Sequence, residues 1–222
     1  MFFWLTSVLG LAGAYLIGAT PTGFLAGKLL KGVDIRTVGS NSTGATNVLR
    51  ALGLGPFLAV LAIDVLKGAA AIVFIRWLSR SLLVWPATQP PAWIEPTALE
   101  SWAVCFAGLA VLLGHARPVW LNFKGGKSVA AGVGMLAAMS WPVAAGSLAV
   151  FGIALALFRI MSVGSILAAV TAVALVFGLD EPLAYRVLLI IGAAFVILRH
   201  RANIGRLLAG TEPRVGRFSQ PG

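Results

Sequence analysis

Residues 39–50, GSNSTGATNVLR, place small polar side chains between glycines and an arginine. The side-chain donors and acceptors belong to Ser40, Asn41, Thr46 and Asn47. Glycine allows tight turns and close backbone approach to a ligand, and the forked guanidinium of Arg50 matches phosphate geometry. We therefore expect this stretch to bind a phosphate. The alternative is a polar turn between helices, in which Ser42 or Thr43 caps a helix.

A second polar stretch, GHARPVWLNFKGGKSVAAG at residues 114–132, leads into a long apolar run. Its candidate phosphate ligands are Lys124, Gly125, Gly126, Lys127 and Ser128. Backbone N–H groups at the start of a helix bind anions, and the two lysines add positive charge. The GxxxxGK[ST] spacing of a Walker A loop is absent. The alternative is a lysine pair that anchors the chain at the lipid headgroups, although the two glycines would not help such anchorage.

The third stretch is RHRANIGRLLAG at residues 199–210. His200, Asn203 and Arg206 recur every three residues and so lie close to one face of a helix. Histidine exchanges protons near neutral pH, which makes His200 a candidate acid or base. Asn203 is a candidate partner in the same chemistry, and Arg206 a supporting residue. The alternative is a basic tail that marks the cytoplasmic side of a membrane protein.

Some candidates lie outside these stretches. Asp64 and Lys67 are three residues apart in an apolar segment, so we expect them to pair and to have a structural role. His115 follows a glycine at the end of an apolar segment and is expected to be a supporting residue. Ser162 and Ser165 are candidate catalytic serines, and helix capping explains either of them equally well.

Several kinds of site have no basis in the sequence. Neither histidine belongs to an HExxH or other metal-binding pattern, and the G-x-S-x-G motif of serine hydrolases is missing. Cys105 is the single cysteine, so one chain can form neither a disulfide nor a cysteine zinc site. We therefore expect no metal and no cofactor.

The elements that carry these residues must lie in a membrane. Of the 222 residues, 59% are hydrophobic and 11% are charged, whereas about a quarter of a soluble domain is charged. In a soluble protein, the net charge of +10 would suggest a nucleic-acid partner. In a membrane protein it reflects the Lys and Arg residues that gather in cytoplasmic loops, and no nucleic-acid partner is expected.

The apolar segments predict about seven transmembrane helices in one domain, residues 1–222, and thus an all-α polytopic membrane protein. Residues 128–158 carry no charge and are too long for one ordinary helix. We place a break at Trp141–Pro142, because proline favours the start of a helix. The proline-rich residues 80–100 are interpreted as an interfacial loop. The predicted spans are residues 3–25, 55–76, 101–114, both halves of 128–158, 165–179 and 183–198.

The distribution of charge orients these spans. With the N-terminus outside, the segments on the cytoplasmic side are 28–50, 114–127, 159–164 and 199–222. They hold 13 of the 17 basic residues, and the last of them is Arg217. The positive-inside rule therefore places all three polar stretches and the C-terminus on the cytoplasmic side. The first apolar segment lacks a basic start and a cleavage site, and is interpreted as a retained helix.

In their order and spacing, the three stretches resemble the motifs of the bacterial acyl-phosphate:glycerol-3-phosphate acyltransferases. The family patterns are similar to GSGNxGATNxxR, GHxxPxxLxFKGGKxVA and RHxxNIxRLxxGxE. The matching residues here are GSNSTGATNVLR, GHARPVWLNFKGGKSVA and RHRANIGRLLAGTE, and DVLKG at 64–68 is also similar. The chain departs from the first pattern at Asn41 and Ser42, where the family usually has Gly-Asn.

This resemblance implies transfer of a fatty acyl group from acyl phosphate to the 1-hydroxyl of sn-glycerol-3-phosphate. The implied products are lysophosphatidic acid and inorganic phosphate, formed in the first step of phospholipid synthesis. It further implies a multi-pass enzyme of the bacterial inner membrane with a cytoplasmic active site and no cofactor. Lys124, Lys127 and the 125–128 amides are expected to hold one phosphate, and Arg50 with the 39–47 turn the other.

The sequence leaves three questions open. Either His200 or the leaving phosphate accepts the proton of the attacking hydroxyl. The family's active-site serine corresponds to Ser162 or to Ser165. An organophosphate transporter and a lipid-binding scaffold are the alternatives to an enzyme, although the polar groups gather on one face rather than at the bilayer midplane. The acyl-chain preference and the oligomeric state are not encoded in these motifs.

Overall fold

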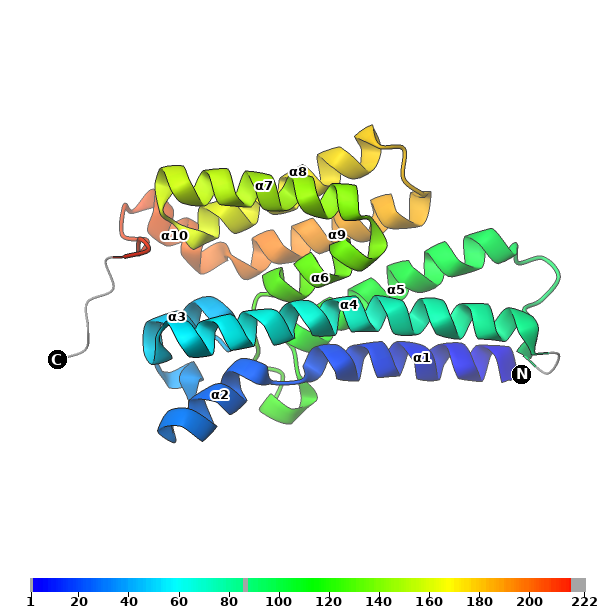
Figure 1. Cartoon of the computed structure of the whole chain (residues 1–222), viewed down its shortest axis with the longest axis horizontal. Helices are drawn as coiled ribbons and strands as arrows, with labels where there is room; N and C mark the ends of the chain where they lie inside the picture. Colours follow the sequence, from blue (N-terminus) through cyan, green and yellow to red (C-terminus); the bar gives the residue numbers. More distant parts are fainter. Residues whose placement is uncertain (1, 86–87, 217–222) are drawn as a thin grey trace.

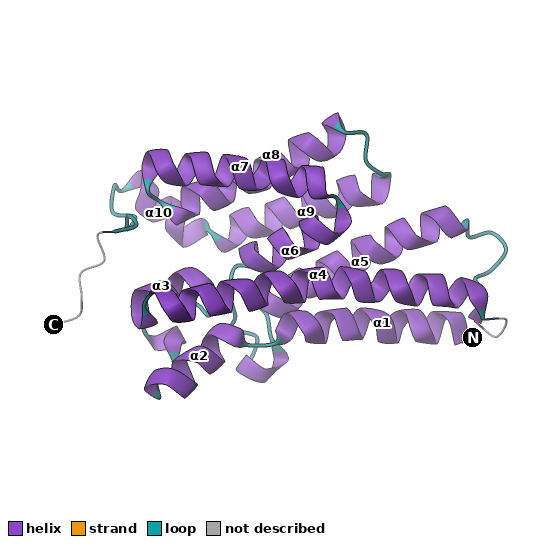
Figure 2. Ribbon diagram, viewed as in Figure 1, coloured by secondary structure: helices purple, strands orange, loops and turns teal. Residues whose placement is uncertain are grey.

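The computed structural model describes residues 2–85 and 88–216, which form helices, turns and loops but no strand (Figures 1 and 2). The α-helices are α1 (Phe2–Ala19), α2 (Thr22–Lys31), α3 (Ala45–Leu52), α4 (Leu54–Val84), α5 (Pro96–Ala116), α6 (Val129–Met139), α7 (Trp141–Phe158), α8 (Met161–Gly178), α9 (Leu183–Arg199) and α10 (Arg201–Leu208). The expectation of an all-helical membrane protein is confirmed. Arg217, predicted to lie in the cytoplasmic tail, is outside the described residues.

Five helical segments in the described residues are long and apolar enough to cross a membrane. They are Phe2–Lys31, Leu54–Val84, Pro96–Leu121, Trp141–Phe158 and Met161–Gly178. Helices α9 and α10, which meet at an angle of 57°, give a sixth if they count as one span. Helix α6 has 11 residues, which make it about 16 Å long, shorter than the apolar core of a bilayer. All seven predicted spans are helical, and the number of crossings stays a prediction.

The helices form two groups with α6 between them (Figure 1). Helices α1, α4 and α5 pack on one another, α8 packs between α7 and α9, and α6 packs against α4 and α7. The short helices α2, α3 and α10 lie at the end of the molecule farthest from the N-terminus (Figure 1). The three polar stretches are therefore brought to the same end of the helix bundle.

The predicted first span over residues 3–25 lies within the candidate span Phe2–Lys31, but its helix is broken, because α1 ends at Ala19 and α2 begins at Thr22. Pro21 has no backbone N–H and cannot continue a helical hydrogen-bond pattern. The carbonyl of Thr20, left without a helical partner, accepts a hydrogen bond from Lys67 Nζ at 3.0 Å. Helix α2 then runs on to Lys31, into the segment 28–50 that is predicted to lie on the cytoplasmic side, and Gly32 ends it in the left-handed conformation with φ +68°.

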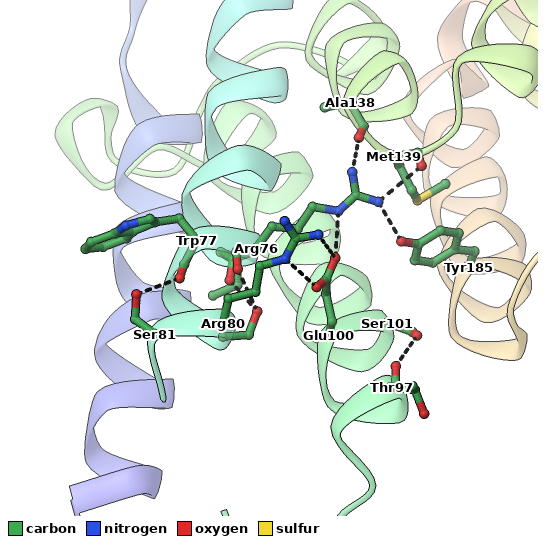
Figure 3. A network of polar contacts seen from close by, with 12 residues as sticks. Arg76, Trp77, Arg80, Ser81, Thr97, Glu100, Ser101, Ala138, Met139 and Tyr185 are labelled. Atoms are coloured by element: carbon green, nitrogen blue, oxygen red, sulfur yellow. Dashed lines mark hydrogen bonds and ion pairs between the residues drawn. The ribbon is translucent and has the colours of Figure 1, made fainter. Parts of the chain in front are cut away.

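The predicted interfacial loop at residues 80–100 is mostly helical at its two ends. Helix α4 continues to Val84, and α5 begins at Pro96, which occupies the first turn where its missing N–H costs nothing. Arg80 and Glu100 can lie in these helices because they pair with each other, with 2.9 Å between Nε and Oε2 (Figure 3). Charge pairing thus lets both helices extend past the residues that marked the end of the apolar pattern.

The predicted break at Trp141–Pro142 is confirmed, since α6 ends at Met139 and α7 begins at Trp141. The last carbonyls of α6 would lack partners in an apolar surrounding. The guanidinium of Arg76 donates to the carbonyls of Ala138 and Met139 and also to the hydroxyl of Tyr185 (Figure 3). This arginine on α4 therefore caps the C-terminal end of α6 and connects it to α9.

Helix α6 lies against α4 almost backbone to backbone. A Cβ atom added at Gly68 would lie 2.0 Å from the carbonyl oxygen of Ala131, and one added at Gly134 would lie 1.8 Å from that of Val65. Real side chains do not tolerate such distances, so only glycine fits these two positions. The close contact fixes the N-terminal end of α6, which follows the second polar stretch, against the α4 segment that contains Asp64.

Candidate active site

A cavity of about 470 Å³ joins the three polar stretches. Its walls come from α3, α4, α5, α6, α7, α8, α9 and α10 and from the loops beside them. Its polar wall consists of Ser40, Ser42, Thr46, Asn47, Arg50, Asp64, His115, Lys127, Ser128, Ser147, Ser162, Ser165, His200, Asn203 and Glu212. The remaining wall is largely apolar and reaches Ala144 on α7 and Ala172 on α8. The cavity thus has polar groups at the end where the motifs meet, and an apolar extension between helices.

The first stretch owes its shape to Asn47, which is 1% exposed. Its Nδ2 donates to the carbonyls of Ile35, Val38 and Ser42 at 2.8, 3.0 and 2.9 Å. Its Oδ1 accepts from the backbone N–H of Ser40 at 2.8 Å. These bonds use the polar atoms of the amide, so Asn47 holds the turn closed around the cavity rather than offering a free donor. A side chain at Gly39 would lie only 2.2 Å from Asn47 Oδ1.

The other predicted residues of this stretch divide into two groups. Ser40, Thr46 and Arg50 line the cavity. Asn41 is exposed, has a positive φ of 50° and is not among the lining residues. Ser42, which occupies the position where the chain departs from the family pattern, is buried and lines the cavity. Burial lowers the pKa of the Arg50 guanidinium, although arginine keeps its charge at any physiological pH.

The second stretch folds back on the end of α5. The backbone N–H groups of Gly125 and Gly126 donate to the carbonyls of Ala116 and His115, each at 3.1 Å. These two amides, expected from the sequence to hold a phosphate, are therefore already paired inside the protein. Arg199 donates to the Gly126 carbonyl at 2.9 Å and fastens the turn from its other side. The glycines therefore shape this turn.

Of the charged and hydroxyl groups in this stretch, Lys127 and Ser128 line the cavity. The Oγ of Ser128 donates to the Leu112 carbonyl at 2.7 Å, so this buried hydroxyl is engaged by α5. Lys127 Nζ donates to Asn203 Oδ1 on α10. Lys124 is exposed and is not among the lining residues, so the structure does not bring it to the cavity with Lys127.

The third stretch surrounds a carboxylate that received no role from the sequence, Glu212. It is 8% exposed and accepts three hydrogen bonds. The donors are Ser162 Oγ at 2.9 Å, Asn203 Nδ2 at 2.5 Å and Arg206 Nε at 2.7 Å. Glu212 is the last residue of the third matched motif, and that position was the signal for it. The side chain joins α8, α10 and the C-terminal segment at the cavity.

The two candidate serines differ in their partners. Ser162 Oγ donates to Glu212, whereas Ser165 Oγ donates to the Met161 carbonyl of its own helix at 2.8 Å. Both residues are buried and both line the cavity. Ser162 is therefore part of the polar network that contains Asn203 and Lys127, while the hydroxyl of Ser165 is satisfied within α8.

His200 lies in the bend between α9 and α10. Its Nδ1 is 2.8 Å from the Val196 carbonyl oxygen, which can only accept, so Nδ1 holds the proton in the neutral ring. Nε2 is then an acceptor. Burial, reinforced by the charge of Lys127, lowers the pKa of His200 to about 4. At neutral pH the ring is therefore uncharged, and its Nε2 can accept a hydrogen bond.

The charges around the network favour an anion. Burial lowers the pKa of Lys127 to about 8, with Glu212 opposing the shift and nearby arginines adding to it. Burial alone would raise the pKa of Glu212, but hydrogen bonds from Asn203, Ser162 and Arg206 outweigh this effect and lower it. The cations of Lys127 and Arg50 thus lie in the cavity wall near the carboxylate of Glu212.

The predicted supporting residues are also placed. Asp64 and His115 line the cavity, and Lys67 pairs with Asp64 at 2.7 Å. Arg206 does not line the cavity and pairs with Glu212. In the part of the chain that the structure describes, no three or more His, Cys, Asp or Glu side chains form a group that could hold a metal ion.

Comparison with known proteins agrees with these features. The family model described as glycerol-3-phosphate acyltransferase matches residues 8–210. "Glycerol-3-phosphate acyltransferase 2" of Rhizobium johnstonii is 61% identical over 219 residues, which cover 99% of this chain and all of that protein. The glycerol-3-phosphate acyltransferase of Acaryochloris marina is 51% identical over 203 residues, covering 91% of this chain and 89% of that one.

Two crystal structures of PlsY (YgiH), described as an integral membrane glycerol 3-phosphate acyltransferase, have the same fold. The glycerol 3-phosphate form has a TM-score of 0.80 and 36% identity, and the match covers 95% of this chain and 96% of that one. The lysophosphatidic acid form has a TM-score of 0.78 and 35% identity, with 95% of each chain covered. With the family model and the curated relatives, these matches establish that the chain belongs to the glycerol-3-phosphate acyltransferase family and is an integral membrane acyltransferase of phospholipid biosynthesis.

Proposed function

We propose that the whole chain forms one acyltransferase domain that uses acyl phosphate as the donor and sn-glycerol-3-phosphate as the acceptor. The 1-hydroxyl oxygen attacks the acyl carbonyl carbon, and the bond between this carbon and the phosphate oxygen breaks. The hydroxyl proton leaves with inorganic phosphate, and the lipid product is lysophosphatidic acid. The lysophosphatidic acid form of the PlsY structure supports this product. No cofactor takes part in the proposed reaction.

The observation that carries the proposal is one cavity with a cationic end and an apolar extension. The cationic end contains Lys127, Arg50 and His200, and the apolar extension contains Ala144 and Ala172. The lining runs along twelve residues of α7, from Leu155 to Ala144, and along twelve of α8, from Met161 to Ala172. The ends of each stretch are about 16 Å apart. This length suits most of a fatty acyl chain, while the two phosphates remain at the motifs.

The two cations that line the cavity divide between the phosphates. Arg50 on α3, with Ser40 and Thr46 beside it, forms one binding group, and Lys127 forms the other. Because acyl phosphate is already an activated anhydride, the enzyme needs no covalent intermediate. Holding the two reactants together is enough to supply several of the roughly 7–11 kcal/mol available from proximity and orientation.

The proton goes to the leaving phosphate in this mechanism. A phosphate group has a second ionisation near a pKa of about 6, above the value of about 4 for His200. The phosphate is therefore the stronger base. His200 accepts a hydrogen bond from the 1-hydroxyl at Nε2 and orients its oxygen toward the carbonyl carbon. Ser162 and Asn203, both bonded to Glu212, complete the wall around the reacting groups.

We further propose that the cavity opens toward the cytoplasm of a bacterium and that the helices span its inner membrane. The basic residues support this orientation, because they gather at the end where the motifs meet: Lys28 and Lys31 lie on α2, Arg201 begins α10, and Arg214 follows α10. Soluble glycerol-3-phosphate then enters from the cytoplasm, and the acyl chain occupies the apolar extension between helices.

The donor is tested with detergent-purified protein, glycerol-3-phosphate and either palmitoyl phosphate or palmitoyl-CoA. The release of phosphate and the formation of lysophosphatidic acid are followed together. We expect equal amounts of both products from palmitoyl phosphate and no lipid product from palmitoyl-CoA. Product from palmitoyl-CoA alone, in protein whose folding is verified by its melting temperature, would overturn the proposed donor.

A further inference from the structure

A buried polar cluster lies beside the cavity and has no part in the reaction described above. Its centre is Asp64 on α4, which is fully buried. Asp64 Oδ1 accepts from Thr22 Oγ1 at 2.5 Å and lies 2.7 Å from Lys67 Nζ. His115 Nδ1 is 3.7 Å from the same oxygen. A buried ion pair inside a membrane protein is costly unless several partners stabilise it, so the presence of this pair suggests a specific role.

One side of the cluster leads to the first polar stretch. Thr22, which donates to Asp64, is the first residue of α2, and Thr20, which accepts from Lys67 at 3.0 Å, follows the end of α1. The pair therefore fixes both sides of the break at Pro21 and with it the direction of α2. Helix α2 in turn lies directly against the 39–50 turn, because a Cβ atom at Gly23 would be 1.9 Å from the Thr43 carbonyl oxygen.

The other side of the cluster leads to the second polar stretch. The carbonyl of His115 accepts the backbone N–H of Gly126 at 3.1 Å. The imidazole packs directly against the same turn, since a Cβ atom at Gly126 would lie 2.1 Å from His115 Nε2. Lys127 follows immediately and reaches the cavity. The position of the His115 ring therefore determines the backbone position from which the Lys127 side chain extends.

We propose that Asp64 and Lys67 are positioning residues that hold the two phosphate-binding stretches in place relative to each other. They hold the first stretch through Thr22 and α2, and the second through His115. Asp64 Oδ1 accepts a hydrogen bond from Thr22 on α2 and lies 3.7 Å, beyond hydrogen-bond distance, from His115 Nδ1 on α5. One carboxylate is thus next to two helices that are distant in sequence. A change at Thr22 displaces the turn that leads into α3 and Arg50, and a change at His115 displaces the turn that carries Lys127. A change at Asp64 displaces both.

The test compares Thr22→Val, His115→Ala and Asp64→Asn in purified protein. For each variant we measure the KM values for glycerol-3-phosphate and palmitoyl phosphate, kcat and the melting temperature. We expect Thr22→Val and His115→Ala to raise the KM of different substrates, each between about 10- and 100-fold, as displacement of a binding group by about an ångström does. Asp64→Asn is expected to raise both KM values.

Two control variants separate positioning from general stability. Thr22→Ser keeps the hydroxyl that Asp64 accepts and should restore the KM lost in Thr22→Val. Ser79→Ala removes another buried hydroxyl of α4, one that bonds only to its own helix, at Ile75 and Arg76. It should lower the melting temperature without changing either KM. If Thr22→Val and His115→Ala behave like Ser79→Ala, the cluster is a folding element only, and the proposal fails.

This inference rests on the proposed function only for the acyl phosphate measurement. Calorimetric titration of glycerol-3-phosphate into the same proteins needs no donor, and one of the two single variants should bind it more weakly than the wild type. Unchanged affinity in Thr22→Val, His115→Ala and Asp64→Asn would overturn the positioning role. Absence of wild-type turnover with palmitoyl phosphate would overturn the donor alone.

Discussion

At the scale of single residues, the site separates groups that shape the cavity from groups that face its contents. The side-chain amide of Asn47 is hydrogen-bonded within the turn that it closes, and the backbone N–H groups of Gly125 and Gly126 are hydrogen-bonded to the end of α5. Lys127 and His200 line the cavity with altered acid–base properties instead. The predictions at this scale concern the latter two side chains.

The first prediction concerns pH. The pKa of Lys127 is lowered to about 8 by burial, so its positive charge is lost as the pH rises through this value. Phosphate binding weakens when the cation is neutralised, and kcat/KM reports groups of the free enzyme. We therefore expect kcat/KM to decline above about pH 8 in the wild type. In Lys127→Arg the charge is permanent, and the decline should shift to higher pH even if overall activity is reduced.

If activity declines at the same pH in Lys127→Arg as in the wild type, the decline belongs to a group other than Lys127.

His200 gives a separate expectation for the acidic side of the profile. Its pKa of about 4 means that the ring stays neutral throughout the range from pH 5 to 8. Protonation of His200 should therefore reduce activity only near pH 4, below the range in which an ordinary histidine titrates.

The second prediction distinguishes orientation from proton transfer at His200. His200→Ala removes the Nε2 acceptor and should lower kcat by about 100-fold, as loss of a positioned group does. His200→Gln offers an amide oxygen that accepts a hydrogen bond but takes up no proton. We expect this variant to retain clearly more activity than the alanine variant. Equal loss in both would favour His200 as the base, and near wild-type turnover in His200→Ala would remove it from the mechanism.

At the scale of elements, short helices and helix breaks bring the motifs together. Helices α2, α3 and α10 have 10, 8 and 8 residues, and α6 has 11. Such helices leave many backbone groups without partners inside the helix. Lys67 supplies one partner at the break after α1, and Arg76 supplies others at the end of α6. Two charged residues of the long helix α4 thus make two interruptions in neighbouring helices tolerable.

The third prediction follows from the capping of α6. Arg76→Met leaves the carbonyls of Ala138 and Met139 without their donor, and an unsatisfied buried carbonyl costs about 1–3 kcal/mol. The melting temperature in detergent should therefore fall. Arg80→Met is the matched control, because the Arg80 side chain is 70% exposed and pairs with Glu100. It should lower the melting temperature much less. An equal effect of the two substitutions would show that capping by Arg76 contributes little.

Most of the helices could be predicted from the sequence, and the predictions that failed did so for identifiable physical reasons. The apolar pattern located every long helix, and Pro142 correctly marked the break before α7. The break at Pro21 was missed because the surrounding residues carry no charge, and the groups that stabilise it come from α4, far along the chain. The extension of α4 beyond residue 76 was missed because Arg80 finds its partner on another helix.

For the site, the motifs predicted which stretches meet but not the function of each atom. Twelve of the predicted residues in the three stretches and α8 line the cavity or bond to a lining residue: Ser40, Thr46, Asn47, Arg50, Gly126, Lys127, Ser128, Ser162, Ser165, His200, Asn203 and Arg206. Lys124 and Asn41 point elsewhere, because backbone direction decides which side of a turn faces inward. Glu212 could not be assigned, since its partners depend on how the C-terminal segment folds back.

At the scale of the whole molecule, the proposed phosphate-binding groups lie at one end of the cavity, and the apolar extension lies between helices. The fourth prediction concerns the side of the membrane that this end faces. Because Cys105 is buried and is the single cysteine, it can be replaced by alanine to give a background without thiols. Arg214→Cys should then react with a membrane-impermeant maleimide only after the inner membrane is opened, and Glu95→Cys should react in intact spheroplasts. The reverse pattern would invert the proposed orientation.

The most direct measurement is the acyl-chain profile of an enzyme whose cavity has been shortened. Ala172 on α8 is buried and lines the apolar extension, whereas Ala174 on the same helix is exposed and does not line it. With acyl phosphates of increasing length, Ala172→Phe should favour shorter chains than the wild type, and Ala174→Phe should keep the wild-type profile. If Ala172→Phe turns over every chain length as the wild type does, the acyl chain does not lie in this cavity, and the shared site for both substrates is contradicted.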